Sequence, residues 1–188
     1  MTPMPNTKPQ ITYAVSLHPS KEAEEIIVSA VKALADASGN DFIVKSRIPP
    51  HITLGAFHAT KEKEARLLEL VTDFSRMQRP GKIQFTGIGS FKKKVIFLKP
   101  QKDSFLTKMN AELHKILLKE FERAENGYYL PEIWLPHTAL ATRVNQAHFD
   151  QAVKLAEQIK LPLETEAKEI ALYQCHPSFT ELKRFPLG

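Results

Sequence analysis

A histidine preceded by proline and followed by an apolar stretch occurs twice in this chain. The two copies are residues 48–54 (IPPHITL) and 135–140 (LPHTAL). Proline lacks an amide hydrogen and fixes φ, so within a sheet it suits the first residue of a strand. The sequence therefore predicts two buried strands, 51–57 and 137–144, and each of them begins at a histidine.

Alternation along these strands determines which side chains accompany each histidine. Residues i and i+2 of a strand share a face, so Thr53 is expected beside His51 and Ala139 beside His137. Imidazole titrates at about pH 6.5 and can serve as a base or as an acid. Two such histidines, one with a hydroxyl beside it, indicate acid–base chemistry on a phosphate.

At these residues the chain resembles the two-histidine (2H) phosphoesterase superfamily, which includes the bacterial 2'-5' RNA ligase-like proteins. That family carries two His-x-Thr/Ser-x tetrapeptides with apolar x, one in each half of the chain. Residues 51–54 (HITL) fit the pattern fully, whereas residues 137–140 (HTAL) fit at the histidine and the leucine only. Ala139 stands where a hydroxyl is expected, and Thr138 is one place early. The resemblance covers the order of elements from about Ile11 to Leu187.

The resemblance implies an α+β, bilobal fold, in which two pseudo-symmetric antiparallel β lobes line a central cleft with helices outside. It also implies hydrolysis, or the reverse ligation, of a 2',3'-cyclic phosphate or a 2'-5' phosphodiester of a nucleotide or an RNA end. His51 and His137 would be the general acid and base, and Thr53 would bind the phosphate. The alternative is a nucleotide- or RNA-binding module that has lost turnover, and the missing hydroxyl at Ala139 would indicate that loss.

The apolar pattern predicts alternating strands and helices over one domain, 1–188, with 1–9 as a flexible tail. Besides the two motif strands, strands are predicted at 11–17, 42–44, 82–91 and 95–99. Helices are predicted after Ser20, after Thr60, around 106–117 and over 146–159. Residues 163–175 and 178–185 are predicted to form a closing hairpin. Each approximate half, 10–95 and 96–188, supplies one motif strand followed by a helix. This near-repeat favours two similar lobes.

Several other residues are candidates to bind substrate. Tyr13 and Phe91 could stack on a base, although core packing is the alternative for both. Lys92 and Lys94 belong to a basic hairpin tip, 92–94, that could guide RNA or could simply be a solvated turn. Thr138 is a further candidate, although alternation turns it away from the cleft. The remaining histidines are expected at the surface or in turns, namely His18, His58, His114, His148 and His176.

Composition limits the remaining classes of protein. The chain has 188 residues, of which 43% are hydrophobic, enough for one substantial core. Its formal net charge of +5 suits a phosphate-bearing partner and equally suits ordinary solubility. The single Cys175 fits a reducing compartment. Neither motif histidine has carboxylates or cysteines at ligand spacing, so neither a metal nor a cofactor is expected. Since no apolar run approaches the ~18 residues of a membrane span, we expect a soluble, cytoplasmic monomer without a membrane partner.

Overall fold

Two antiparallel sheets form the framework of the computed structural model, which describes residues 10–188. The five-stranded sheet has the order β5-β2-β1-β8-β9, and the four-stranded sheet has the order β6-β4-β3-β7. The first consists of Glu122–Arg123 (β5), Ile52–Ala59 (β2), Ile11–His18 (β1), Glu169–His176 (β8) and Thr180–Pro186 (β9). The second consists of Thr138–Thr142 (β6), Val95–Pro100 (β4), Gly81–Phe91 (β3) and Leu163–Ala167 (β7). The predicted tail, 1–9, lies outside the described residues.

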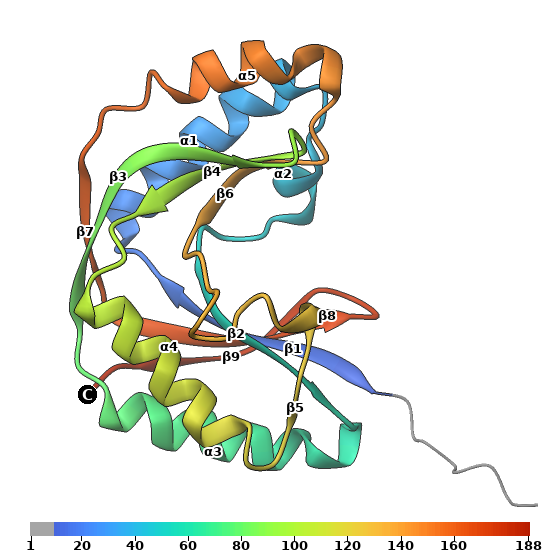
Figure 1. Cartoon of the computed structure of the whole chain (residues 1–188), viewed down its shortest axis with the longest axis vertical. Coiled ribbons are helices and arrows are strands. Elements are labelled where there is room, and N and C mark those ends of the chain that lie inside the picture. Colours follow the sequence, from blue (N-terminus) through green and yellow to red (C-terminus); the bar gives the residue numbers. More distant parts are fainter. Residues whose placement is uncertain (1–9) are drawn as a thin grey trace, which may run out of the picture.

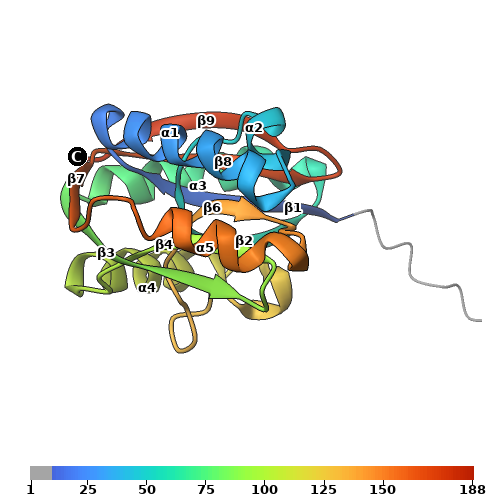
Figure 2. The ribbon, with the colours of Figure 1, turned by 90° about the horizontal axis from the view of Figure 1, so that it is seen from above.

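Helices cover the outer faces of both sheets. They are Lys21–Ser38 (α1), Phe42–Ser46 (α2), Glu64–Met77 (α3), Ser104–Leu117 (α4) and Phe149–Ala156 (α5), with 3-10 turns at Lys61–Lys63, Glu125–Gly127 and Gln146–His148. In Figure 1, α1 and α5 lie over the four-stranded sheet, and α3 and α4 lie under the five-stranded sheet. Figure 2 shows α1 and α5 side by side above the strands. The predicted α+β fold with two β lobes and outer helices is confirmed.

The two lobes do not coincide with the sequence halves 10–95 and 96–188. The C-terminal strands β8 and β9 join β1 and β2, while β3 from the first half pairs with β4 and β7. The helices cross over as well, because α1 packs against β6 of the four-stranded sheet and α4 packs against β2 of the five-stranded sheet. Each lobe is therefore assembled from both halves of the chain.

The segment 42–44 was predicted as a short edge strand, and that prediction is wrong. These residues belong to α2, where the Lys45 amide donates to the Asp41 carbonyl over 2.9 Å. The Lys45 ammonium also pairs with the Asp41 carboxylate at 2.9 Å, one helical turn away. Arg47 then ends the helix with a left-handed φ of 51°. Local pairing along the chain outweighs the β-branched residues that suggested a strand.

The closing hairpin is also shorter than predicted. Residues 163–175 are two strands in different sheets, since β7 pairs with β3 and β8 pairs with β1 and β9. Their burial differs accordingly. β7 alternates exposed and buried residues, whereas the middle of β8, residues 170–173, is buried on both faces. The hairpin that closes the chain is β8–β9.

Local signals place α1 as predicted. The Ser20 hydroxyl accepts a hydrogen bond of 3.4 Å from the Ala23 amide at the N-terminus of the helix. Gly39 ends the helix in the left-handed conformation, with φ 66°. The helix buries Ile27, Val31 and Leu34, which are spaced for one face. α1 therefore packs against β6 of the four-stranded sheet.

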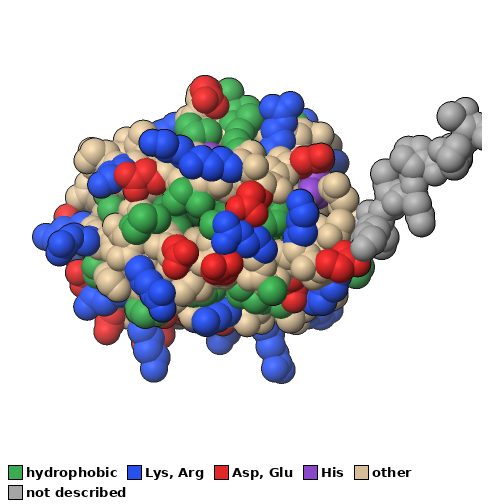
Figure 3. Space-filling model, turned by 90° about the horizontal axis from the view of Figure 1, so that it is seen from below, with side chains coloured by type: hydrophobic (Ala, Val, Ile, Leu, Met, Phe, Trp, Pro, Cys, Tyr) green, Lys and Arg blue, Asp and Glu red, His purple; other side chains and the backbone are tan. Residues whose placement is uncertain are grey.

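The outer surface below α3 and α4 carries charges of both signs. Figure 3 shows lysine and arginine side chains interspersed with acidic ones on this face. Arg66 of α3 pairs with Glu69 at 2.8 Å and with Glu120 at 2.7 Å. This face therefore does not form a one-sign patch for a polyanion. None of the helices in the described part of the chain is long and apolar enough to cross a bilayer.

Candidate active site

The two motif histidines have the same local geometry. The Nδ1 atom of His51 lies 2.7 Å from the carbonyl oxygen of Pro49, and that of His137 lies 2.9 Å from the carbonyl oxygen of Leu135. A carbonyl only accepts, so Nδ1–H donates in both rings. In a neutral imidazole, Nε2 is then left with its lone pair. Both histidines thus present the same nitrogen for proton transfer.

The two motifs meet although they lie in different sheets. His51 directly precedes β2 and His137 directly precedes β6, each one residue earlier than the strand itself. The Thr138 hydroxyl donates to the carbonyl oxygen of His51 over 3.0 Å. Thr138 is 1% exposed, and it holds the backbone of the other motif. Thr138 lines neither the cavity beside His51 nor the cavity beside His137, and its role in substrate binding stays a prediction.

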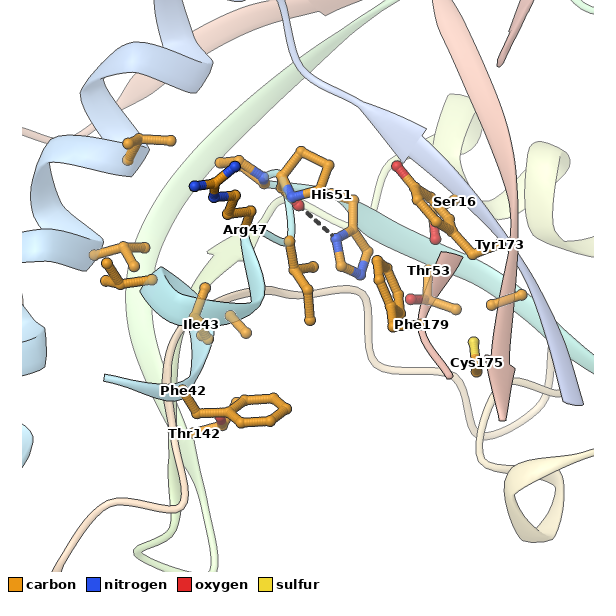
Figure 4. Close-up of a pocket in the computed structure, with 18 of the residues that line it drawn as sticks. Ser16, Phe42, Ile43, Arg47, His51, Thr53, Thr142, Tyr173, Cys175 and Phe179 are labelled. Atoms are coloured by element: carbon orange, nitrogen blue, oxygen red, sulfur yellow. Dashed lines mark hydrogen bonds between the residues drawn. The ribbon is translucent and has the colours of Figure 1, made fainter. Parts of the chain in front are cut away.

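A cavity of about 510 Å³ lies between the sheets, lined by His51, Thr53 and Ala139 among others. The side chains at positions 53 and 139 therefore face the same space, as alternation predicted. In Figure 4, Tyr173 and Phe179 stand on one side of His51, while Phe42 of α2 lies across the cavity. The walls combine aromatic surface with hydroxyl and imidazole groups, which is a pattern typical of small-ligand sites.

A second cavity of about 530 Å³ adjoins the other histidine. Its lining includes His137, Phe91, Lys92 and Tyr128. Tyr129 lines both cavities. The two histidines therefore border two spaces with Tyr129 common to both, and a ligand could extend to either side of them.

The sequence matches the family model of the 2'-5' RNA ligase superfamily over residues 17–177. The chain belongs to this superfamily. Among curated proteins, none matches the sequence significantly. The resemblance to 2H phosphoesterases is thereby confirmed at the level of the superfamily.

Solved structures share the fold. E. coli LigT complexed with 3'-AMP is 17% identical, with a TM-score of 0.62 over 95% of this chain and 99% of that one. TT0787 of Thermus thermophilus is 20% identical, with a TM-score of 0.62 over 94% and 98%. Kluyveromyces marxianus Usb1 is 11% identical, with a TM-score of 0.51 over 96% and 99%. At these identities the likeness establishes the fold of this 2'-5' RNA ligase superfamily member.

Burial controls the protonation of both histidines in this superfamily member. Desolvation lowers the pKa of His51, and so does the charge of His137, against the opposing hydrogen bond to Pro49. Desolvation likewise lowers the pKa of His137 against its bond to Leu135. Because a proton on His137 disfavours one on His51, the pair favours states with at most one proton. One acid and one base is such a state.

Aromatic rings enclose the second histidine. The Phe91 ring meets His137 edge-on with centroids 5.0 Å apart, and the Phe97 ring lies at 5.2 Å. Phe91 is half-buried, and its ring centroid lies 4.3 Å from that of Phe97, with the two planes tilted by 31°. Phe91 thus forms a wall of the second cavity, and its contact with a base stays a prediction.

The lysines of the predicted hairpin tip differ in their positions. Lys92 and Lys93 turn the chain with φ of 47° and 52°, which is typical of a tight hairpin turn. Lys92 lines the second cavity. Lys93 lies over the Phe149 ring at 5.9 Å, and Lys94 is exposed while its carbonyl accepts from the Val144 amide over 3.0 Å. Lys92 is therefore the lysine of this tip that adjoins the site.

Tyr13 does not belong to the site, and its candidate role in stacking is wrong. Its side chain has no exposed surface and packs in the core, and its hydroxyl donates to Glu64 over 2.8 Å. The alternative of core packing is confirmed. Alternation along β1 could not decide this, because β1 is buried on both faces.

Two aromatic residues, Trp134 and Tyr129, support the first motif. The sequence placed Tyr129, with Tyr128, as a possible cover of the cleft before the second motif and did not single out Trp134. The indole of Trp134 donates to the Thr53 carbonyl over 3.1 Å. Burial raises the pKa of the Tyr129 hydroxyl, against an opposing influence of the nearby Thr53 side chain. Asn110 of α4 fixes the tyrosine's backbone, since its amide donates to the Tyr129 carbonyl over 2.8 Å and to the Leu54 carbonyl over 2.7 Å. The only signal was the aromatic content of the connection 124–134.

Two of the other histidines were wrongly expected at the surface or in turns. His18 is fully buried at the end of β1, and His114 is 3% exposed in α4. Both are bonded to backbone carbonyls, of Pro50 and Asn110 respectively, which offsets the cost of burying a polar ring. Within residues 10–188, no group of three or more His, Cys, Asp or Glu side chains is placed to hold a metal ion.

Proposed function

We propose that this protein is a metal-independent phosphoesterase that acts on a 2',3'-cyclic phosphate or a 2'-5' phosphodiester of a nucleotide or RNA end. His51 and His137 serve as its general acid and base. The observation that carries the proposal is the matched geometry of the two rings, each with Nδ1–H bonded to the carbonyl two residues earlier. Both Nε2 atoms are then free to exchange protons with a ligand.

Each ring transfers one proton in the reaction: one ring accepts a proton as the base, and the other donates a proton as the acid. One neutral imidazole takes a proton from water at Nε2 while the water oxygen bonds to phosphorus. The other, protonated ring gives its Nε2 proton to the departing ribose oxygen as the P–O bond breaks. A cyclic phosphate is thereby opened to a phosphomonoester. When a ribose hydroxyl attacks in place of water, the same base takes the hydroxyl proton, the same acid protonates the departing oxygen, and a phosphodiester forms; in the reverse reaction the two rings exchange roles. Because both rings present Nε2, either histidine can take either role.

Hydroxyl groups supply the hydrogen bonds that the added phosphoryl charge requires. Thr53 lines the cavity beside His51, and Tyr129 lies near Thr53 and lines both cavities. We infer that Tyr129 provides the donor that Ala139 lacks. Preorganised donors of this kind act where charge develops in the transition state.

His51 lines one cavity and His137 lines the other, and the two cavities share Tyr129, which supports a substrate with groups on both sides of the phosphorus. The first cavity has an aromatic wall at Phe42 and Phe179, and the second has Tyr128 and Phe91. Aromatic surface is suited to nucleobases. The E. coli LigT structure complexed with 3'-AMP is a further reason to expect a nucleotide.

A substrate panel tests the proposal. The purified protein is incubated with the four 2',3'-cyclic nucleotides, an RNA ending in a cyclic phosphate, a 2'-5'-linked dinucleotide and its 3'-5'-linked counterpart, with and without EDTA. We expect turnover of a cyclic phosphate or the 2'-5' linkage, slower cleavage of the 3'-5' linkage, and no loss with EDTA. Inactivation by EDTA, or cleavage of the 3'-5' linkage alone, contradicts the proposal.

The alternative function is a nucleotide- or RNA-binding module without turnover, which Ala139 favours. The same panel separates the two, because binding of a cyclic nucleotide by calorimetry without any product over many hours identifies the module. Restoring the family pattern with Ala139→Thr is then the informative variant. Gain of turnover in that variant would assign the loss of activity to position 139.

A further inference from the structure

A buried chain of polar groups lies directly behind His51. His18, the last residue of β1, has no exposed surface. Its Nδ1 atom lies 3.2 Å from the Pro50 carbonyl oxygen, and its Nε2 atom lies 3.0 Å from the Tyr173 hydroxyl. The His18 and His51 rings are 6.3 Å apart between centroids. His18 therefore bridges β8 and the turn that carries His51.

Charged side chains of β8 and β9 surround the Tyr173 end of this polar network. The Tyr173 hydroxyl lies 2.9 Å from a carboxylate oxygen of Glu181. Arg184 donates to both oxygens of that carboxylate, at 2.9 and 3.1 Å, and also pairs with Glu169. Glu181 thus has two donors from arginine in addition to the tyrosine. The Tyr173 hydroxyl donates to this carboxylate, and its oxygen lies 3.0 Å from His18 Nε2.

The hydrogens of this network define the state of His18. The Pro50 carbonyl only accepts, so the Nδ1–H of His18 donates to it, while Nε2 lies 3.0 Å from the Tyr173 hydroxyl oxygen. Burial lowers the pKa of His18 to about 3, with further lowering by His51 and Arg184. The ring is therefore neutral near pH 7 and adds no charge beside His51.

The contact of His18 falls on the peptide that joins Pro50 to His51. That turn has two prolines, which offer carbonyls but no amide hydrogens. Its Pro49 carbonyl orients the His51 ring, and its Pro50 carbonyl is held by His18. A rotation of the turn would move the acceptor of His51 Nδ1–H and so the direction of Nε2.

We propose that His18 is a positioning residue for His51, held in place by Tyr173 and acting through the Pro50 carbonyl. Its effect on turnover rests on the proposed function, whereas its effect on the His51 ring does not. Without the bond from His18, the turn samples other conformations and His51 loses its single tautomer. A displacement of about 1 Å at a reacting group can cost on the order of 100-fold in rate.

The test compares three variants with a matched control. His18→Leu removes both hydrogen bonds, His18→Asn returns an amide donor near the position of Nδ1, and Tyr173→Phe removes the partner of Nε2. The control is His114→Leu, because His114 is also buried and bonded to a backbone carbonyl, that of Asn110, at 2.8 Å. The readouts are kcat and KM on the best substrate of the panel, thermal unfolding, and ¹⁵N NMR of the His51 ring.

We expect His18→Leu to lower kcat by about 10–100-fold with KM changed by less than about threefold. His18→Asn should recover most of kcat, and Tyr173→Phe should lower it by about three- to tenfold. His114→Leu should lower the melting temperature and leave kcat within about twofold of the wild type. Unchanged kcat in folded His18→Leu, or an equal loss in His114→Leu, overturns the proposal.

The NMR readout separates this proposal from the proposed function. Wild-type His51 and His18→Asn should show mainly one neutral tautomer with the hydrogen on Nδ1, and the His18→Leu and Tyr173→Phe variants should show a mixture. This holds even if no substrate of the panel is turned over. If His18→Leu does not fold, His18→Asn and Tyr173→Phe carry the test, and identical His51 spectra in wild type and Tyr173→Phe overturn the proposal.

Discussion

The Thr138 hydroxyl donates a hydrogen bond of 3.0 Å to the carbonyl oxygen of His51, so the strand after one motif histidine holds the backbone of the other. Thr138→Val keeps the shape and removes the donor. Because it leaves a buried carbonyl unpaired, we expect a loss of about 1–3 kcal/mol in the free energy of unfolding, measured in urea. Thr138→Ser should retain most of that stability. A large fall in kcat with unchanged unfolding would mean that Thr138 reaches the phosphate.

The two histidines should be separately required for turnover. His51→Ala and His137→Ala each remove one proton-transfer group, so each should lower kcat by about 10²–10⁴-fold. His58→Ala is the control, since His58 lies farther along the same strand, with its ring 3.3 Å from the Thr12 hydroxyl. Near-normal turnover in either motif variant would exclude the two-histidine mechanism.

The stability of the fold should depend on pH through His18. Its pKa is about 3 in the folded protein and about 6.5 in an unfolded chain. As pH falls below about 6.5, the unfolded chain gains a proton that the folded chain does not, so the free energy of unfolding decreases. In His18→Asn, residue 18 does not titrate, so this contribution to the pH dependence is absent. The stability of this variant should fall less steeply between about pH 6.5 and 5, by up to about 1.4 kcal/mol per pH unit.

Urea unfolding at about pH 7, 6 and 5 checks this difference in slope. Glu181 and Arg184 also face the network, but both remain in the variant, so the comparison isolates residue 18. Parallel stability curves for the wild type and His18→Asn would show that His18 is not buried in its neutral form.

The sequence predicted features that depend on short-range rules and missed those that depend on partners far along the chain. Proline before histidine, alternation at Thr53 and Ala139, and the Ser20 cap are local, and the structure has all of them in place. The assembly of each lobe from both halves depends on strand pairing across more than 100 residues, such as β1 with β8. A hydropathy pattern carries no information on that choice.

The same limit applies to the site. His18 ends a strand whose residues are buried on both faces, so neither its burial nor its partner Tyr173, 155 positions away, follows from its neighbours. Tyr129 comes from an irregular connection, where no periodicity indicates the direction of a side chain. Such residues are identified only once the sheets are in register.

The hairpin tip offers a test of how far an RNA substrate extends. Lys92 and Lys94 are both exposed, but only Lys92 of the two lines the second cavity. Lys92→Ser should weaken binding of an RNA end and reduce its log–log salt slope by about 0.7, the value for one phosphate contact to a single strand. Lys94→Ser is the matched control. Equal effects of both changes on RNA and on a cyclic mononucleotide would indicate general electrostatics instead of a contact.

The last prediction concerns the missing hydroxyl of the second motif. Thr53 is the motif hydroxyl in the first cavity, and Ala139 faces the same space without one. If Tyr129 fills the gap, Thr53→Ala and Tyr129→Phe should each lower kcat by about 10²–10³-fold, as for the loss of a preorganised donor. Ala139→Thr should be neutral or raise kcat, and it should raise kcat more in Tyr129→Phe than in the wild type.

A double-mutant comparison measures that dependence directly. Rescue of Tyr129→Phe by Ala139→Thr means that the two positions supply one hydrogen bond to the same phosphoryl group, because groups that act on one atom are not additive. Trp134→Phe is the structural control, since it removes the indole bond to the Thr53 carbonyl together with part of a buried ring and should act mainly on stability. If Tyr129→Phe keeps kcat and raises KM alone, the tyrosine binds the ligand equally in the ground and transition states, and the missing donor lies elsewhere.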